Sequence, residues 1–89
     1  MDDPYLNLRK QLELEEWPNV YMFKFIFPNT SENIAHTIAL FNEESAEITL
    51  HESKTGKFAS ISVKELMLDV DSIIEKYENA TKIKGLMAL

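Results

Sequence analysis

Residues 20–27 read VYMFKFIF, and this stretch decides the fold. Val, Tyr, Phe and Ile suit a pleated surface, and the run is short enough to favour a strand over a helix. Successive side chains of a strand point to opposite faces. One face therefore carries four aromatic residues: Tyr21, Phe23, Phe25 and Phe27. Because burying an unpaired lysine is costly, we expect these aromatics to form the core and the opposite face, with Lys24, to meet solvent or a partner.

A hairpin is indicated further along the chain. Residues 45–53 alternate between apolar and polar, and residues 54–57 form a turn in which Gly56 accepts a positive φ without steric cost. Pairing across this turn matches like with like: Leu50 with Ile61, Ile48 with Val63, His51 with Ser60 and Thr49 with Ser62. Such matching is typical of a half-buried hairpin.

Helical patterns flank the strands. Residues 1–19 predict an N-terminal helical extension, with Asp3 as cap and Pro4 in the first turn, ending before Trp17-Pro18. We expect Trp17 to cover the core. A second helix is capped by Asn29 with Glu32, or by Thr30 or Ser31. Its apolar stripe is Ile34, Ile38 and Phe41.

The C-terminal part predicts a helix and a strand. The helix opens at Asp69 and ends at Asn79-Ala80, and its apolar stripe consists of Val70, Ile73, Ile74 and Tyr77. Residues 82–89 are expected to form a last strand, with Ile83 and Met87 on one side and Lys84 and Leu86 on the other.

The element order is therefore β-α-β-β-α-β after the extension. It predicts an α+β fold of the ferredoxin-like type over residues 20–89, preceded by a short N-terminal helix in residues 1–19. Two helices cover one face of a four-stranded antiparallel sheet. The first strand should lie inside the sheet, beside the third.

Composition excludes several classes of protein. A formal net charge of −6 opposes nucleic-acid binding, which requires a positive surface. The absence of cysteine excludes disulfides, thiolate zinc sites and cysteine-held iron–sulfur clusters. The first residues, MDDPYLNLRK, are acidic and lack the apolar segment of a signal peptide. No run is long enough for a membrane span, so we expect a cytoplasmic protein.

The sequence lacks a set of residues that could carry out catalysis. The two histidines, His36 and His51, have no second histidine or cysteine at a metal-ligand spacing. His51 opposite Ser60 resembles a base and a nucleophile, but no third group orients the histidine. We therefore expect a protein that is not an enzyme, with no catalytic residue, no metal and no cofactor.

Several short motifs resemble the YbeD-like family of small bacterial proteins. They are Trp17-Pro18 with Tyr21 and Lys24, then Ser53-x-x-Gly56-x-Phe58-x-Ser60, then Tyr77 and the spacing on to Leu89. The resemblance implies a ferredoxin-like fold, likened to ACT-type domains that bind small effectors, and a link to lipoate metabolism through gene neighbourhood. It implies no catalytic or ligand residue. ACT domains usually have a glycine between the first strand and the first helix, but residues 27–31 contain none, which disfavours effector binding there.

The outward face of the sheet remains as a candidate site. Apolar residues gather there beside polar ones: Met22, Ile26, Phe58 and Leu86, bordered by Lys24, His51, Ser60, Ser62 and Lys84. Such a convergence suggests that something covers this face. The occupants considered are a second copy in a homodimer, the N-terminal helix, a partner protein or a small effector. We expect a regulatory or adaptor domain that binds protein through Met22, Lys24, Ile26, His51, Phe58 and Ser60; the alternative is an ACT-like sensor of a small molecule, which predicts ligand-dependent stabilisation.

Overall fold

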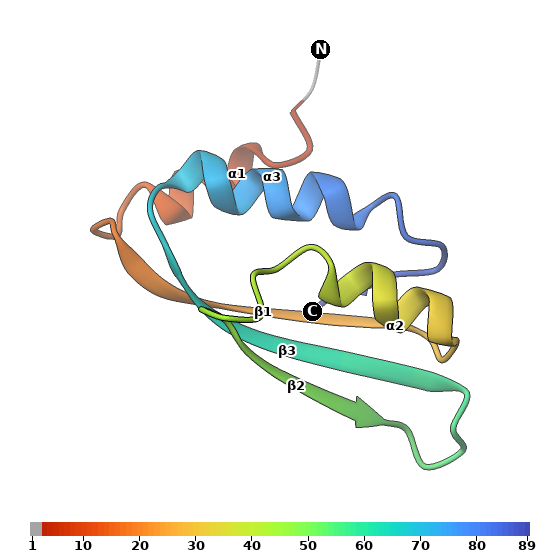
Figure 1. Ribbon diagram of the computed structural model, residues 1–89. Coiled ribbons are helices and arrows are strands. Elements are labelled where there is room, and N and C mark those ends of the chain that lie inside the picture. The colour runs from red at the N-terminus through yellow and green to blue at the C-terminus, as the bar shows by residue number, and fades with distance from the viewer. Residues whose placement is uncertain (1–2) are drawn as a thin grey trace.

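A four-stranded antiparallel sheet carries three helices on one side in the computed structural model, which describes residues 3–89 (Figure 1). The strands are β1 (Asn19–Pro28), β2 (Glu47–Glu52), β3 (Phe58–Met67) and β4 (Met87–Ala88), in the order β2-β3-β1-β4. The helices are α1 (Leu6–Leu12), α2 (Ser31–Ile38) and α3 (Val70–Ala80). The prediction of a small α+β fold with β1 beside β3 is confirmed.

Aromatic side chains of β1 form the centre of the core. Phe23, Phe25 and Phe27 are 0% exposed, as the alternation in residues 20–27 predicts. The Phe23 ring lies 5.2 Å from that of Phe41, centroid to centroid, and Tyr77 of α3 packs at 5.5 Å on the same ring. The core is thus closed by the helices on one side of the sheet only.

The hairpin between β2 and β3 has the predicted register. Leu50 lies opposite Ile61, Ile48 opposite Val63, His51 opposite Ser60 and Thr49 opposite Ser62. Gly56 has a φ of 74°, as the turn requires. Leu50, on the inward side, is nevertheless exposed because β2 is an edge strand.

The expected last strand over residues 82–89 is wrong in extent. β4 contains only Met87 and Ala88, which pair with Ile26 and Phe25. A turn precedes it, in which the Leu86 amide donates to the Ile83 carbonyl at 3.3 Å and Gly85 has a φ of 76°. A residue with positive φ cannot continue a regular strand.

This turn also reorients the side chains around it. Leu86 packs against the core and does not lie on the outward face, so its expected place there is wrong. Ile83 is buried whereas Met87 is exposed, so these two residues do not share a side.

The N-terminal helix is shorter than predicted. α1 ends at Leu12, five residues before Trp17, and turns follow in which the Leu14 and Glu15 amides bond to carbonyls three residues back. The Asp3 carboxylate accepts from the Tyr5 amide at 2.9 Å, although Tyr5 and not Asp3 is the cap residue. Trp17 packs on the core, as expected, and its indole N–H donates to the Leu12 carbonyl at 2.8 Å.

Helix α2 begins at one of the alternative caps. The Thr30 hydroxyl accepts from the Asn33 amide at 3.0 Å. Phe41 is buried beyond the helix end, and the most buried positions within α2 are polar, Asn33 and Thr37. The Thr37 hydroxyl donates to the Asn33 carbonyl, and the Asn33 side-chain amide donates to the Pro28 and Lys84 carbonyls at 3.0 and 3.4 Å. Asn33 therefore ties the end of β1 to the turn before β4.

Helix α3 has the predicted boundaries. The Asp69 carboxylate caps it by accepting from the Ser72 hydroxyl at 2.7 Å and the Ser72 amide at 2.8 Å. These two bonds, the hydroxyl first, lower the pKa of Asp69. Ile73 and Ile74 of α3 are buried in the core. Val70 and Tyr77 of the same helix pack against this core.

Candidate functional site

The side of the sheet without helices is called here the open face. Its residues alternate with buried ones along each strand and pair with one another across strands. They are Val20, Met22, Lys24, Ile26 and Pro28 of β1, Glu47, Thr49 and His51 of β2, Phe58, Ser60, Ser62, Lys64 and Leu66 of β3, and Met87 of β4.

All six predicted site residues lie on the open face. Ser60 is opposite both Ile26 and His51, and Phe58 is the next outward residue of β3, opposite Pro28, so four of the six form one cluster. Lys24 lies one outward position further along β1, opposite Ser62, and Met22 one position beyond it, opposite Lys64. Their role in binding stays a prediction.

The apolar part of the open face is larger than the sequence indicated. Ten large hydrophobic side chains are exposed within residues 3–89, and five of them lie on this face: Val20, Met22, Phe58, Leu66 and Met87. Val20 is 60% exposed and Leu66 is 59% exposed, and the two are cross-strand partners. Side chains of residues 58–67 alternate between the two faces of the sheet, and this alternation already indicates that Leu66 points outward.

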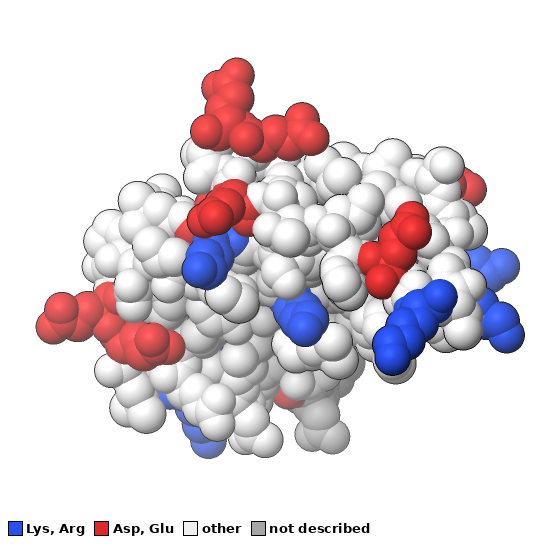
Figure 2. Space-filling view, turned by 90° about the horizontal axis from the view of Figure 1, so that it is seen from below, with Lys and Arg blue, Asp and Glu red and all other residues white. Residues whose placement is uncertain are grey.

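Charge on the open face differs from that of the whole chain. Fifteen acidic residues give the chain its net charge of −6, yet Glu47 is the single acid among the outward strand positions of the described residues. Lys24 and Lys64 lie on the two middle strands. Figure 2 shows this side of the molecule largely white, with red acidic groups mainly toward its margins. The face is therefore apolar with a basic centre.

The N-terminal helix does not cover the open face. α1 packs beside α3, in the helical layer on the opposite side of the sheet (Figure 1). Leu12 and the half-buried Tyr5 and Leu8 join the core cluster from that side. Of the occupants considered for the open face, the helix is excluded.

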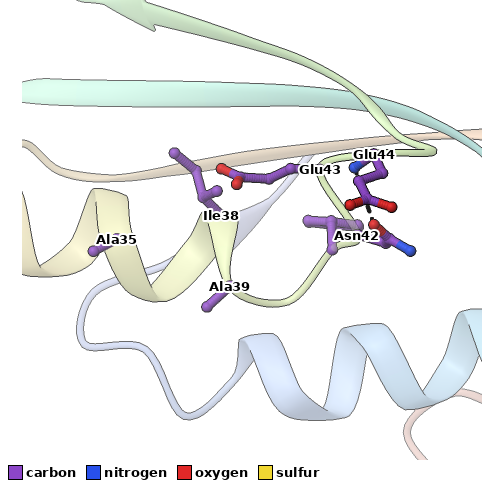
Figure 3. A pocket seen from close by; sticks show the side chains of 7 residues that line it. Ala35, Ile38, Ala39, Asn42, Glu43 and Glu44 are labelled. Atoms are coloured by element: carbon purple, nitrogen blue, oxygen red, sulfur yellow. Dashed lines mark hydrogen bonds between the residues drawn. The ribbon is translucent and has the colours of Figure 1, made fainter.

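Several hollows lie on the helical side. One of about 600 Å³ is a shallow surface at the end of α2, where Figure 3 shows Ala35, Ile38, Ala39 and the acidic pair Glu43 and Glu44. The Glu44 amide donates to the Asn42 side-chain oxygen at 3.0 Å, which fixes this loop internally. A smaller hollow, about 190 Å³, is lined by Thr81 and by aromatic and aliphatic side chains: Tyr5, Phe25, Tyr77, Ala80, Leu86 and Ala88.

Tyr77 at the smaller hollow is engaged by a second tyrosine. Its hydroxyl lies 2.8 Å from that of Tyr21. Burial, followed by this hydrogen bond, raises the pKa of Tyr77 far above its ordinary value, so the phenol remains neutral at any physiological pH. The two hydroxyl groups therefore join β1 to α3 by a hydrogen bond between neutral phenols.

Groups that could perform metal or proton chemistry are dispersed. The part of the chain that the structure describes contains no cluster of three or more His, Cys, Asp or Glu residues able to hold a metal ion. Within residues 3–89, no hydrogen bond joins His51 to Ser60, although they are cross-strand neighbours. No helix of the described residues is long and apolar enough to cross a membrane.

One partly buried glutamate was missed by sequence reasoning. Glu65 occupies an inward position of β3, opposite Tyr21 and between the buried residues Val63 and Met67. Its Oε2 atom is buried and has no hydrogen-bond partner within residues 3–89. The same alternation that places Leu66 outward would have revealed it.

We expect Glu65→Met to raise the free energy of unfolding by about 1 kcal/mol, because an unsatisfied buried polar atom is replaced by apolar atoms of similar length. Urea denaturation measures the change. Glu75→Met, on the exposed side of α3, is the matched control and should change stability by about 0.5 kcal/mol or less. A loss of stability in Glu65→Met would show that its carboxylate is satisfied in solution.

Comparison with known proteins finds no relative: no family model, curated protein or solved structure matches this chain. The functional conclusion therefore depends on the chain's own surface. The resemblance to the YbeD-like family stays a prediction.

Proposed function

We propose that this protein is a non-enzymatic regulatory or adaptor domain that acts by binding protein through the open face of its sheet. The observation that supports it most is the concentration of exposed apolar side chains there. Val20, Met22 and Met87 are more than half exposed, on a sheet face that the described helices leave uncovered. Apolar side chains gathered on one uncovered face of a protein often mark a site where a partner binds.

The surface area of the protein supports the same proposal. Its accessible surface is 6266 Å², whereas a compact monomer of 10.3 kDa is expected to expose about 5,400 Å². The excess of about 900 Å² is close to the roughly 800 Å² that each partner hides in a standard protein–protein interface.

The finer fold class and the family belong to this proposal too. The order β-α-β-β-α-β after α1, with strand order β2-β3-β1-β4, supports a ferredoxin-like domain. The motifs around Trp17-Pro18 and from Ser53 to Ser60 support membership of the YbeD-like family.

One observation favours a second candidate, the ACT-like sensor of a small molecule. The hollow of about 190 Å³ beside Phe25 and Tyr77 is apolar and has room for a small group. A sensor would be stabilised by its ligand, whereas a protein-binding domain need not respond to any metabolite. A link to lipoate metabolism rests on the family resemblance alone.

Affinity capture with matched variants tests the first candidate. Met22→Glu/Phe58→Glu places two charges on the open face, and we expect it to lose, at least about tenfold, the binding of any protein that the wild type binds, because a charge buried against apolar surface is costly. Each captured protein, a second copy included, is then titrated against purified wild type and variant to measure the dissociation constant.

A control variant guards against a general effect of added charge. Leu6→Glu/Leu14→Glu alters two side chains that are 45% and 87% exposed and lie in and directly after α1, outside the open face. It should bind as the wild type does. The proposal is wrong if the open-face variant and the control variant bind alike.

A further inference from the structure

We infer that the outer edge of β1 at residues 20–23 is a docking site for an extended peptide segment of another protein, which adds to the sheet as a strand antiparallel to β1. The inference goes beyond the proposed function, because it concerns backbone groups at an edge of the sheet and not the side chains of the open face. It rests on how β1 is paired, on where its free backbone groups point and on a hollow beside the same edge.

One side of β1 is paired along only part of its length. β3 pairs with β1 from end to end, whereas β4 pairs with it only at Phe25 and Ile26. The Leu89 amide adds one bond, to the Lys24 carbonyl at 2.8 Å. Within residues 3–89 no other strand joins the sheet on this side, so residues 19–23 of β1 form a free edge.

The direction of the free backbone groups follows from these bonds. In an antiparallel sheet the amide and carbonyl of one residue point to the same neighbouring strand, and the side alternates from residue to residue. Since the Lys24 carbonyl points to the β4 side, the amides and carbonyls of Met22 and Val20 point there too. The Val20 amide bonds to the side chain of its neighbour Asn19, at 2.8 Å. In the part of the chain that the structure describes, no strand reaches Met22 from this side.

These backbone groups specify an extended peptide. A peptide that continues the register of β4 places one residue opposite Met22 and another opposite Val20, and both exchange amide and carbonyl bonds with β1. A helix cannot take this place, because its amides and carbonyls bond to one another. Addition of a strand to a free edge is a common way of binding peptides.

Apolar side chains beside the edge favour the same occupant. Val20 and Met22 are 60% and 53% exposed, and they point to the open face at this end of β1. The peptide residues paired with them point to the same face, about 5 Å away. Apolar side chains of the peptide would therefore cover part of both residues.

The hollow of about 190 Å³ provides a pocket on the helical side. Its lining includes Phe25 and Ala88, which are cross-strand partners, together with Tyr77. The peptide residue opposite Phe23 is the next inward position on this edge, about 7 Å from Ala88, which is within reach of a large side chain. Because the lining is mainly aromatic and aliphatic, we expect a large apolar residue there. A pocket for one side chain gives strand addition its specificity.

Peptide selection tests the site. The probe is a library of random heptapeptides displayed on phage and selected against the wild type, and the selected peptides are synthesised and titrated. Binding should slow hydrogen exchange of the Met22 amide at least about tenfold, because this amide becomes a donor in the added pair. The Phe23 amide points to β3 and is the internal reference, which should change little.

Methylation of the peptide backbone separates strand addition from other modes of binding and leaves the protein unaltered. Every second amide of an added strand points to β1. Methylating the nitrogen of one of these should weaken binding at least about tenfold, whereas methylating an amide between them should change it less than about threefold.

Ala88→Phe tests the pocket, because the new ring fills the hollow from β4. It should weaken binding at least about tenfold. Ala35→Phe makes the same change at an exposed position of α2, away from the edge, and should bind as the wild type does. Circular dichroism checks that both variants are folded.

Each other outcome overturns the inference without deciding the proposed function. A library that yields no binding peptide rejects the site. Peptides that leave the exchange of the Met22 amide unchanged, or that tolerate methylation equally at both sets of amides, bind elsewhere. A Met22 amide that becomes protected as the concentration of the free protein rises shows that a second copy pairs at this edge. The open face is judged separately, by capture with Met22→Glu/Phe58→Glu.

Discussion

Phe23→Ala should lower the free energy of unfolding by about 3–5 kcal/mol. Phe23 is fully buried and its ring contacts those of Tyr21, Phe25, Phe41 and Tyr77. Its removal leaves a cavity at the point where β1, α3 and the segment after α2 meet. Since a chain of 89 residues has a total stability of about 4–13 kcal/mol, this one substitution removes a large share.

Urea denaturation followed by circular dichroism measures the loss, and Phe58→Ala provides the matched control. Phe58 is 47% exposed on the open face, so its truncation should cost about 1 kcal/mol or less in the monomer. Comparable losses for the two variants would contradict the assignment of the aromatic face of β1 to the core.

Gly85→Ala should lower stability by about 2–3 kcal/mol, for two separate reasons. The backbone at Gly85 has a φ of 76°, a conformation that costs a residue with a side chain about 1–2 kcal/mol. In addition, a Cβ atom at Gly85 would lie 2.8 Å from Cγ and Cδ of Pro28, so the ring or the turn has to move.

Gly56→Ala separates these two causes, because Gly56 has nearly the same φ, 74°, and a Cβ atom added there would meet no other atom within 4 Å. It should cost only the backbone contribution, about 1–2 kcal/mol. Thermal and urea unfolding of both variants give the difference, which measures the close approach to Pro28. Equal losses would mean that Pro28 yields without cost.

Much of the sheet could be predicted because its strands are patterned by local rules. The aromatic alternation of residues 20–27 specifies both faces of β1, and the matched pairs across the 54–57 turn specify the register of β2 with β3. The six candidate site residues followed from the same alternation, and all of them lie on one face.

The C-terminal strand and α1 could not be predicted in extent, since long-range contacts decide where they end. The turn before β4 is held by the hydrogen bond from the Asn33 side chain to the carbonyl of Lys84, 51 positions away. It also requires a glycine at position 85, because a side chain there would meet the Pro28 ring. α1 ends where the Trp17 indole reaches the Leu12 carbonyl, a bond that no local pattern announces. Helical and strand periodicity describe one segment at a time, so neither the Asn33–Lys84 bond nor the Trp17–Leu12 bond can be predicted from it.

Asn33 also affects how easily the C-terminal segment detaches from the sheet. β4 contributes two residues to the sheet, and so short a segment would by itself fray on a timescale faster than global unfolding. The Asn33 side chain bonds the Pro28 carbonyl of β1 and the Lys84 carbonyl at once. Detaching the C-terminal segment therefore disturbs the amide that also satisfies the end of the central strand. We therefore expect the last residues of the chain to exchange their amide hydrogens together with α2 and not at the rate of a free terminus.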